Sequence, residues 1–374
     1  MHILIFFTYD YSLKMWQDEK ILERELIYYN NILNKNKDFK FTFVTYGDDD
    51  DLFFVNQLDR IEILPAYTLI KRSPYKLIRY IKSFLIPFYV NKKLENVDIV
   101  KQFQLLGSWI SIIYKFLAKK PLIIRTGYDM YKFSIQDGKS IVKQFFYRSL
   151  TYISLIFSDF YTVTSKSDLD FLNSKFKVNN SKVVIRPNWV EVVRTRPILN
   201  RSLHKILAIG RIEKQKNFQE LLLAFENSNY KIDLYGEGSL RQKLDELSVK
   251  KNIDVSFKGK IQFKDLQKVY SNYCFFVSTS IFEGNPKTIL EAQAAGCVVV
   301  ALREKNTEEI IKNGFNGLLV ESFNDIVNTI NLLDQKTLQD ISSNSVNFIL
   351  KTNELNLVVD TDLQDFNGLT NSSY

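Results

Sequence analysis

Short apolar runs alternate along the chain with polar loops and with segments of helical periodicity. Residues 2–8 form the first run, and residues 20–33 then carry apolar side chains three or four positions apart, as one buried face of a helix requires. Further strands are predicted at residues 40–46, 61–64, 98–103, 121–125, 160–164 and 182–185. Strands that alternate with helices in this way predict a doubly wound α/β domain.

The second half repeats the pattern after a linker at residues 187–203, which contains two prolines. Its predicted strands are residues 205–209, 232–235, 255–257, 274–277, 298–301 and 318–320, and residues 322–366 are mostly helical. The two halves share a pattern but no sequence repeat. We therefore predict two Rossmann-like domains, each with a parallel sheet covered on both faces.

The stretch 275–301 organises the second half. Residues 275–277 predict a buried strand, and a polar loop leads to a helix over residues 287–295. Asn285 is a good N-cap, and Pro286 stands where the first turn of a helix accepts proline. Gly296 is a helix stop before a valine-rich strand. Strand, loop, helix and strand form a βαβ unit.

Two carboxylates in this unit suggest chemistry. Glu283 lies in the loop and Glu291 in the second turn of the helix. Loops at the carboxyl ends of parallel strands bind ligands, and a helix N-terminus suits a diphosphate. A carboxylate beside an anion site needs another partner, and sugar hydroxyls donate hydrogen bonds to carboxylates. The alternative is that both residues are solvated glutamates near a helix end.

The full string decides between these interpretations. Residues 280–296 read Ser-x-Phe-Glu-Gly-x-Pro-x-x-x-x-Glu-Ala-x-Ala-x-Gly, which closely resembles the signature of retaining glycosyltransferases of family 4. These enzymes have the GT-B fold, in which two Rossmann-like domains face a central cleft and the last helix crosses back to the first domain. The resemblance implies an acceptor-side domain at residues 1–190, a nucleotide-sugar domain at 191–350 and the crossing helix at 351–374.

The first loop of the second domain carries cations. From the residues alone, Arg211, Lys214 and Lys216 are equally able to turn toward a diphosphate or to be ordinary surface charge. The resemblance singles out Arg211 and Lys216, since the pair Lys216-Asn217 matches the family pattern. Gly236 and Gly238 follow the next strand, but Arg241 stands where a G-x-G-x-x-G fingerprint needs its third glycine. That departure argues against a nicotinamide enzyme.

The resemblance also implies a role for each site residue. Glu291 is expected to hold the ribose and Glu283 the transferred sugar, while Arg211 and Lys216 neutralise the leaving diphosphate. We count Glu283, Arg211 and Lys216 as the catalytic candidates. The other expected donor contacts are Gly236, Gly238, Gly284, Asn285, Pro286 and Lys287. No metal and no cofactor are expected besides the donor, a UDP or GDP sugar.

The sequence departs from the family pattern at several places. Arg303-Glu304-Lys305 replaces a Gly-Gly, and Trp189 replaces a glycine in the interdomain turn. The loop after the strand at residues 121–125 lacks the histidine found in many members. Three residues there are candidates for acceptor or donor-sugar contacts: Arg125, Tyr128 and Asp129.

Composition narrows the partners. The 374 residues carry a net charge of +8, which favours nucleotides, nucleic acid or an acidic membrane. The lysines fall largely on helical faces, so we expect no nucleic acid. Cys274 and Cys297 lie in apolar strands and predict reduced thiols in a cytosolic protein. No run of about twenty apolar residues predicts a transmembrane helix.

Residues 68–93 combine seven Lys or Arg with many apolar residues and contain no Asp or Glu. This pattern fits a basic amphipathic helix on an anionic membrane surface, and it fits equally a core helix with a basic solvent face. A protein of this kind is expected in the cytoplasm, either free or peripheral on the inner face of the cytoplasmic membrane.

The sequence thus predicts a metal-independent, retaining glycosyltransferase. It would move a sugar from a nucleotide diphosphate donor to a glycan or lipid-linked acceptor in bacterial surface polysaccharide or lipopolysaccharide synthesis. Two alternatives stay open. A nucleotide-sugar epimerase has a similar architecture, and a non-catalytic protein would use only its basic surface on a membrane.

Overall fold

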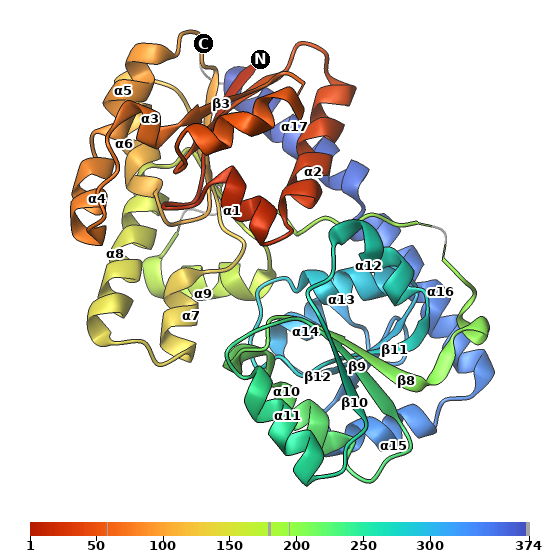
Figure 1. Ribbon diagram of the computed structural model, residues 1–374. Coiled ribbons are helices and arrows are strands. Elements are labelled where there is room, and N and C mark those ends of the chain that lie inside the picture. Colours follow the sequence, from red (N-terminus) through yellow and green to blue (C-terminus); the bar gives the residue numbers. More distant parts are fainter. Residues whose placement is uncertain (58, 179–180, 194, 372–374) are drawn as a thin grey trace. The chain divides into compact units, whose positions relative to one another are not determined.

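A computed structural model describes residues 1–57, 59–178, 181–193 and 195–371 (Figure 1). Contacts between residues divide the chain into two compact units. Unit 1 comprises Met1–Arg186 together with Val359–Tyr374, and unit 2 comprises Pro187–Val358. The chain therefore passes between the units twice, once on each side of unit 2. Each unit is described by itself below.

Unit 1 contains a parallel sheet of seven strands in the order β3-β2-β1-β4-β5-β6-β7. The strands are β1 (His2–Phe6), β2 (Lys40–Thr45), β3 (Ile61–Pro65), β4 (Ile99–Phe103), β5 (Leu122–Arg125), β6 (Phe160–Val163) and β7 (Val183–Ile185). All five residues of β1 are buried, because parallel neighbours lie on both sides and helices cover both faces.

The helices of unit 1 connect these strands. They are α1 (Leu13–Asp18), α2 (Leu22–Lys35), α3 (Ala66–Leu69), α4 (Lys76–Ser83), α5 (Ile86–Lys93), α6 (Ser108–Ala118), α7 (Met130–Gln136), α8 (Ile141–Phe157), α9 (Lys166–Phe176) and most of α17 (Leu355–Asn371). A 3₁₀ segment, η1 (Asp49–Gln57), precedes β3. Figure 1 shows α5, α6 and α8 on one side of the sheet and α2 and α17 on the other.

Unit 2 contains a parallel sheet of six strands in the order β10-β9-β8-β11-β12-β13. The strands are β8 (Ser202–Ile209), β9 (Lys231–Tyr235), β10 (Val255–Gly259), β11 (Tyr273–Ser278), β12 (Val298–Leu302) and β13 (Leu318–Val320). Successive residues enter opposite hydrophobic clusters: Phe275 and Val277 lie in one, and Phe276 lies in the other. This alternation explains why the strands are continuously apolar.

The helices of unit 2 follow its strands. They are η2 (Ile198–Asn200), η3 (Lys214–Lys216), α10 (Phe218–Ala224), α11 (Arg241–Lys250), α12 (Phe263–Tyr270), α13 (Lys287–Ala294), α14 (Lys305–Ile310), η4 (Phe323–Asp325), α15 (Ile326–Asn331) and α16 (Gln335–Thr352). The predicted fold class, two doubly wound parallel α/β sheets, is confirmed. No helix in the described ranges is long and apolar enough to cross a membrane.

One local prediction is wrong. The N-cap of α13 is Pro286, and the side chain of Asn285 accepts a hydrogen bond from the backbone N–H of Asn188 instead. The acidic run at residues 48–51 contributes to the packing of unit 1. Asp51 is buried and accepts the backbone N–H groups of Leu13 and Lys14, which open α1.

Candidate functional site

The candidate donor site of unit 2 lies at the carboxyl ends of β9, β8 and β11, which are neighbours in the sheet. From β8 the chain adds β9 and β10 in one direction, and β11, β12 and β13 extend the other side. The order therefore reverses between β8 and β11. A reversal of this kind leaves a crevice at the strand ends where ligands bind in open α/β sheets.

Lys216 and Glu283 meet at this edge as an ion pair between the ammonium and Oε1. Their side chains are only 16% and 15% exposed. Lys216 ends η3 in the loop after β8, whereas Glu283 lies in the loop after β11. Two residues 67 positions apart in sequence are thus placed in direct contact, as the predicted shared site required.

Backbone contacts lock these two loops together. The N–H of Ile281 donates to the carbonyl of Gln215 at 3.0 Å, and the amide of Gln215 donates to the carbonyl of Phe282 at 2.8 Å. The hydroxyl of Thr279 donates to the carbonyl of Lys216 at 3.0 Å. Because these bonds flank Lys216 and Glu283 on both loops, the ion pair rests on a rigid frame.

Gly236 and Gly238 allow the loop after β9 to approach the loop after β8. A Cβ at Gly236 would lie 1.8 Å from the carbonyl oxygen of Gly210, and one at Gly238 would lie 2.3 Å from that of Ile212. Gly236 also has φ +145°. Any side chain at these positions would push the two loops apart. The glycines predicted to line the nucleotide are therefore needed for the close packing of the site itself.

The start of α13 is fixed by a clamp of buried asparagines. The backbone N–H of Asn188 donates to Oδ1 of Asn285 at 2.9 Å, and its Nδ2 donates to the carbonyl of Asn285 at 2.6 Å. Asn353 donates its Nδ2 to the carbonyl of Asn188 at 2.8 Å. The clamp connects the candidate diphosphate site to residues near the first and last positions of unit 2 in the sequence.

Glu291 points into unit 2 rather than into bulk solvent. It is 6% exposed, and the hydroxyl of Tyr270 on α12 donates to its Oε2 at 3.1 Å. Burial, together with the nearby Glu291 carboxylate, raises the pKa of Tyr270 well above its usual value. The phenol therefore keeps its proton and orients the carboxylate. The alternative of a solvated helix-end glutamate does not fit Glu291.

The remaining cations differ in their surroundings. Arg211 is exposed, so its guanidinium is accessible to a ligand. The ammonium of Lys287 lies over the ring of Trp189, 5.6 Å from its centroid, so the tryptophan that departs from the family pattern contacts the start of α13. Arg303 pairs with Glu308 at 2.9 Å and Glu321 at 2.6 Å, and its charge is largely neutralised.

Comparison with known proteins agrees with this geometry. Residues 194–347, which contain the loops after β8, β9 and β11, match the family model of glycosyl transferases group 1. This part of the chain belongs to that family. The match covers the candidate donor site of the glycosyltransferase but not its unit 1.

Two sequence relatives and one solved structure are also similar to this chain. The glycosyltransferase is 27% identical to an Escherichia coli UDP-Gal:alpha-D-GlcNAc-diphosphoundecaprenol alpha-1,3-galactosyltransferase, over 76% of this chain and 78% of that protein. It is 25% identical to a Campylobacter jejuni N-acetylgalactosamine-N,N'-diacetylbacillosaminyl-diphospho-undecaprenol 4-alpha-N-acetylgalactosaminyltransferase, over 68% and 72%. The structure of Anabaena HepE in complex with UDP and glucose matches with a TM-score of 0.75 at 16% identity, over 99% and 100%. The predicted GT-B fold is thereby confirmed.

The three acceptor-side candidates of the glycosyltransferase lie in unit 1 and differ in accessibility. Arg125 lines a small hollow with Lys101, Asp362 and Asp365, beside α17. Asp129 is 1% exposed, and its Oδ1 caps α7 by accepting the backbone N–H of Lys132 at 2.7 Å. Tyr128 is 41% exposed and packs on Phe133. Of the three, Tyr128 has a surface that a ligand can reach directly, and an acceptor role stays a prediction.

Burial raises the pKa of Asp129 to about 7, and the neighbouring Asp168 carboxylate adds to the rise. Asp168 itself pairs with Lys132 at 2.8 Å. The second oxygen of Asp129 has no hydrogen-bond partner among the described residues. This carboxyl is therefore poised to change its protonation state near neutral pH.

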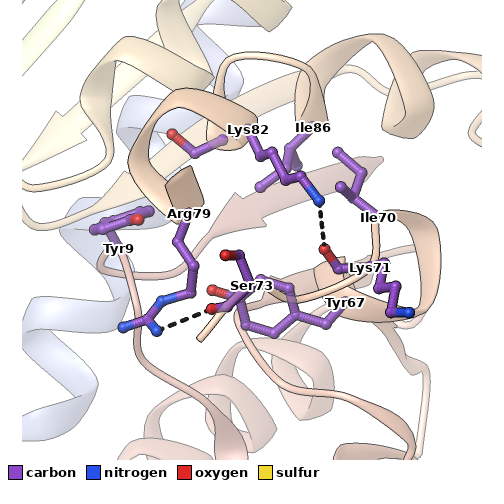
Figure 2. A pocket seen from close by; sticks show the side chains of 9 residues that line it. Tyr9, Tyr67, Ile70, Lys71, Ser73, Arg79, Lys82 and Ile86 are labelled. Atoms are coloured by element: carbon purple, nitrogen blue, oxygen red, sulfur yellow. Dashed lines mark hydrogen bonds between the residues drawn. The ribbon is translucent and has the colours of Figure 1, made fainter. Parts of the chain in front are cut away.

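The basic stretch 68–93 contains α4 and α5, which are separated by residues 84–85, just before Pro87. Arg79 is not a free surface cation: it pairs with Asp10 at 3.0 Å and donates to the carbonyl of Ser73 (Figure 2). Lys82 donates to the carbonyl of Lys71, also drawn in Figure 2. Leu77 and Ile81 of α4 remain exposed. The stretch thus contributes both to the packing of unit 1 and to its surface.

Sequence reasoning missed three residues that hold the site. They are Asn188, Gln215 and Tyr270, which support Asn285, Phe282 and Glu291 respectively. Each is ordinary in its local sequence, and only the fold shows its partner. The nearest signal was the unusual turn at residues 185–191, which contains Asn188.

Proposed function

We propose that this glycosyltransferase moves a sugar, with retention of configuration and without a metal, from a UDP or GDP sugar to a glycan or lipid-linked acceptor. The observation that carries the proposal is the contact between Lys216 and Glu283 at the strand-end edge, beside the start of α13. A cation and a carboxylate held together there match the two parts of a nucleotide sugar, an anionic diphosphate and a sugar rich in hydroxyl donors.

Lys216 supplies charge to the departing diphosphate. Negative charge grows on the leaving oxygen as the bond to the sugar carbon breaks, so a fixed ammonium stabilises the transition state more than the bound donor. Arg211 is exposed at the same loop and adds a planar guanidinium suited to phosphate oxygens. The positive end of the α13 dipole favours the same group.

The two glutamates bind the remaining parts of the donor. Glu283 accepts hydrogen bonds from hydroxyls of the transferred sugar, and Glu291 accepts them from the ribose. Glu291 is buried and oriented by Tyr270, so its carboxylate is held in place to accept hydrogen bonds from ribose hydroxyls. Closure of the site on the donor would exclude the water that competes with the acceptor.

The acceptor class is proposed from the relatives. The Escherichia coli and Campylobacter jejuni enzymes are named for acceptors on diphosphoundecaprenol, which is a lipid carrier. We place the present enzyme in bacterial surface polysaccharide or lipopolysaccharide synthesis, at the inner face of the cytoplasmic membrane. The net charge of +8 and the exposed basic residues of the stretch 68–93 support an anionic membrane surface as a partner.

The decisive experiment follows labelled nucleotide sugars, with and without a mixture of undecaprenol-linked and soluble glycan acceptors. We expect label to move only when an acceptor is present, in EDTA as in Mg²⁺, and the product to keep the anomeric configuration of the donor by NMR. Conversion of the free donor without acceptor would identify an epimerase. Binding of donor with no conversion under any condition would identify a non-catalytic protein.

A second measurement tests the ribose role. Glu291→Ala should weaken binding of UDP or GDP by about 1–3 kcal/mol in calorimetry, because the buried ribose loses its hydrogen-bond acceptor. Tyr270→Phe is the matched control, since it removes the orienting phenol but leaves the carboxylate. We expect a smaller loss there. Equal affinity of Glu291→Ala and wild type would remove the ribose assignment.

A further inference from the structure

Helix α8 (Ile141–Phe157) of unit 1 turns its largest apolar side chains outward. The residues that it buries are Leu150, Thr151 and Ser154, two of which are small and polar. Its exposed apolar residues are Ile141 84%, Val142 78%, Phe145 66%, Phe146 38%, Tyr152 52%, Ile153 41%, Ile156 47% and Phe157 38%. A helix that only covered the sheet would have the opposite arrangement.

The exposed residues form one continuous face. At 100° per residue they fall within an arc of about 160° on the helix, interrupted only by Ser149. Lys143 lies just beyond one edge of the arc and Arg148 just beyond the other. Residues 138–158 contain no Asp or Glu. A wide apolar face with cations at both margins matches a helix lying in the plane of a membrane surface.

A hollow of about 390 Å³ adjoins this face. It is lined by Phe145, Arg148, Ser149 and Tyr152 of α8 and by residues 175–177, at the C-terminal end of α9. Three of the lining side chains are cations, three are aromatic, and none is acidic. A phosphate with an apolar attachment fits such a lining, because the cations pair with the anion while the rings contact the attached chain.

Helix α6 extends the surface. The ring of Phe116 contacts the ring of Phe157 with centroids 5.4 Å apart, and Phe116 is itself 57% exposed. Lys115 on the same helix is held by Asp159 at 2.6 Å, so its charge is largely neutralised there. The apolar face therefore continues from α8 onto the end of α6.

We propose that α8, with the adjoining hollow, docks on an anionic lipid bilayer. Its apolar face enters the boundary between headgroups and acyl chains, and Arg148, Lys175 and Lys177 hold a lipid phosphate. A second copy of the chain fits less well, because a symmetric contact would bring these cations against one another without an acidic partner. The proposal rests on the membrane location proposed above, but it concerns a helix outside the stretch 68–93 and does not depend on the donor sugar.

The test is co-sedimentation of the full chain with vesicles of phosphatidylcholine, alone or mixed with phosphatidylglycerol. We expect binding to the mixed vesicles. The triple variant Ile141→Ser/Val142→Ser/Phe145→Ser should bind at least about tenfold more weakly, because the exposed apolar area is lost. The matched control is Val249→Ser/Leu332→Ser in unit 2, whose side chains are 79% and 85% exposed. It should bind as wild type does.

Two further variants separate the parts of the surface. Arg148→Gln/Lys175→Gln/Lys177→Gln should lose the preference for phosphatidylglycerol, by about fivefold per charge. Phe145→Trp should show a blue shift on adding vesicles and quenching by brominated acyl chains. The three native tryptophans, Trp16, Trp109 and Trp189, are buried, so the signal would report α8.

Three outcomes would overturn the proposal. One is undiminished binding by the triple serine variant, provided its thermal unfolding matches that of wild type. Another is loss of binding in Leu77→Ser/Ile81→Ser of α4 while the α8 variant binds, which would assign the membrane contact to the stretch 68–93 alone. The third is a dimer in the absence of vesicles that the α8 variant abolishes, which would make the face a contact between copies.

Discussion

Lys214 and Lys216 lie two positions apart in η3, yet only Lys216 pairs with Glu283. This difference gives a sharp test of the diphosphate role. Lys216→Ala should lower turnover on the order of 100-fold, since it removes a fixed charge that acts on the leaving group. Lys214→Ala removes an exposed charge from the same loop and should leave turnover nearly unchanged. Steady-state kinetics with saturating donor measures both.

The fold must survive for this comparison to hold. Far-UV circular dichroism and thermal unfolding of both variants should match the wild-type protein. If Lys216→Ala and Lys214→Ala reduce turnover equally, the ion pair has no special part in catalysis and the loop acts only through its overall charge.

Asp129 makes stability depend on pH. Burial raises its pKa from 3.8 to about 7, so between these values the folded state holds a proton that the unfolded state has released. Its contribution to stability is therefore complete below pH 3.8 and is lost as pH rises through 7. Asp129→Asn keeps the oxygen that caps α7 but cannot ionise.

Urea unfolding of wild type and Asp129→Asn at a series of pH values measures this difference. Relative to the variant, wild type should lose about 2 kcal/mol of unfolding free energy between pH 5 and pH 7. Other carboxylates affect both proteins alike, so the difference isolates Asp129. Parallel curves would show that Asp129 is ionised in the folded protein throughout this range.

Individual residues show where sequence reasoning succeeds. Glu283 and Lys216 were predicted to bind one donor because the family resemblance places both in its site, and the structure brings them into contact. The N-cap of α13 was predicted at Asn285 from its side-chain chemistry alone. That prediction failed because a tertiary partner, Asn188, takes the same oxygen. The local preference of a side chain for capping is overridden when a buried donor binds the same oxygen.

At the scale of elements, the asparagine clamp connects α13 to the ends of unit 2. Asn188→Ala would leave the buried carbonyl of Asn285 without its donor, at a cost of about 1–3 kcal/mol in unfolding free energy. It should also weaken binding of UDP or GDP, because the start of α13 loses a support. Asn272→Ala, which removes one exposed hydrogen bond to Lys268, is the control.

Chemical denaturation and calorimetry on the same samples test this prediction. A drop in stability with unchanged donor affinity would show that the clamp supports the fold but does not position the site. A drop in affinity alone would place Asn188 in contact with the donor instead.

Helix α8 shows why periodicity could not predict every surface. Apolar side chains occur on nearly all sides of α8. Which side is buried depends on the neighbour: the hydroxyl of Ser154 bonds that of Ser108 at 2.9 Å, so a close, small-residue contact with α6 decides the orientation. Because the apolar pattern has no clear polar face, it does not indicate which side of the helix is buried.

At the scale of the whole molecule, alternation of strands and helices was enough to predict the fold class. Each domain repeats a short unit, and parallel strands joined by helices have few alternative topologies. The membership of α17 is a different matter. Val359–Tyr374 belongs to unit 1 although it follows unit 2 in sequence. Only the resemblance to a family suggested such a crossing, because the attachment consists of side-chain pairs that no local pattern encodes.

Ion pairs contribute to that attachment. Arg186 binds Asp365 through two hydrogen bonds of 2.6 and 2.7 Å. The ammonium of Lys101, on β4, lies 3.6 Å from Asp362, which also accepts the hydroxyl of Tyr28. The side chains of Lys101 and Asp362 are 5% and 7% exposed. Burial lowers the pKa of Lys101, and the nearby Asp362 opposes that change. The two charges therefore depend on each other.

The last prediction follows from this dependence. Asp362→Ala should cost about 3–5 kcal/mol in unfolding free energy, because it leaves the buried ammonium of Lys101 without its counter-charge. Asp360→Ala, on the same helix, removes an exposed partner of Lys35 and should cost less than about 1 kcal/mol. The double variant Lys101→Met/Asp362→Leu should recover most of the loss, since apolar residues can replace a buried ion pair. Urea unfolding of wild type and the three variants measures these differences in unfolding free energy. If the double variant is as unstable as Asp362→Ala, the hydrogen bond from Tyr28, rather than the charge of Lys101, holds α17 to unit 1.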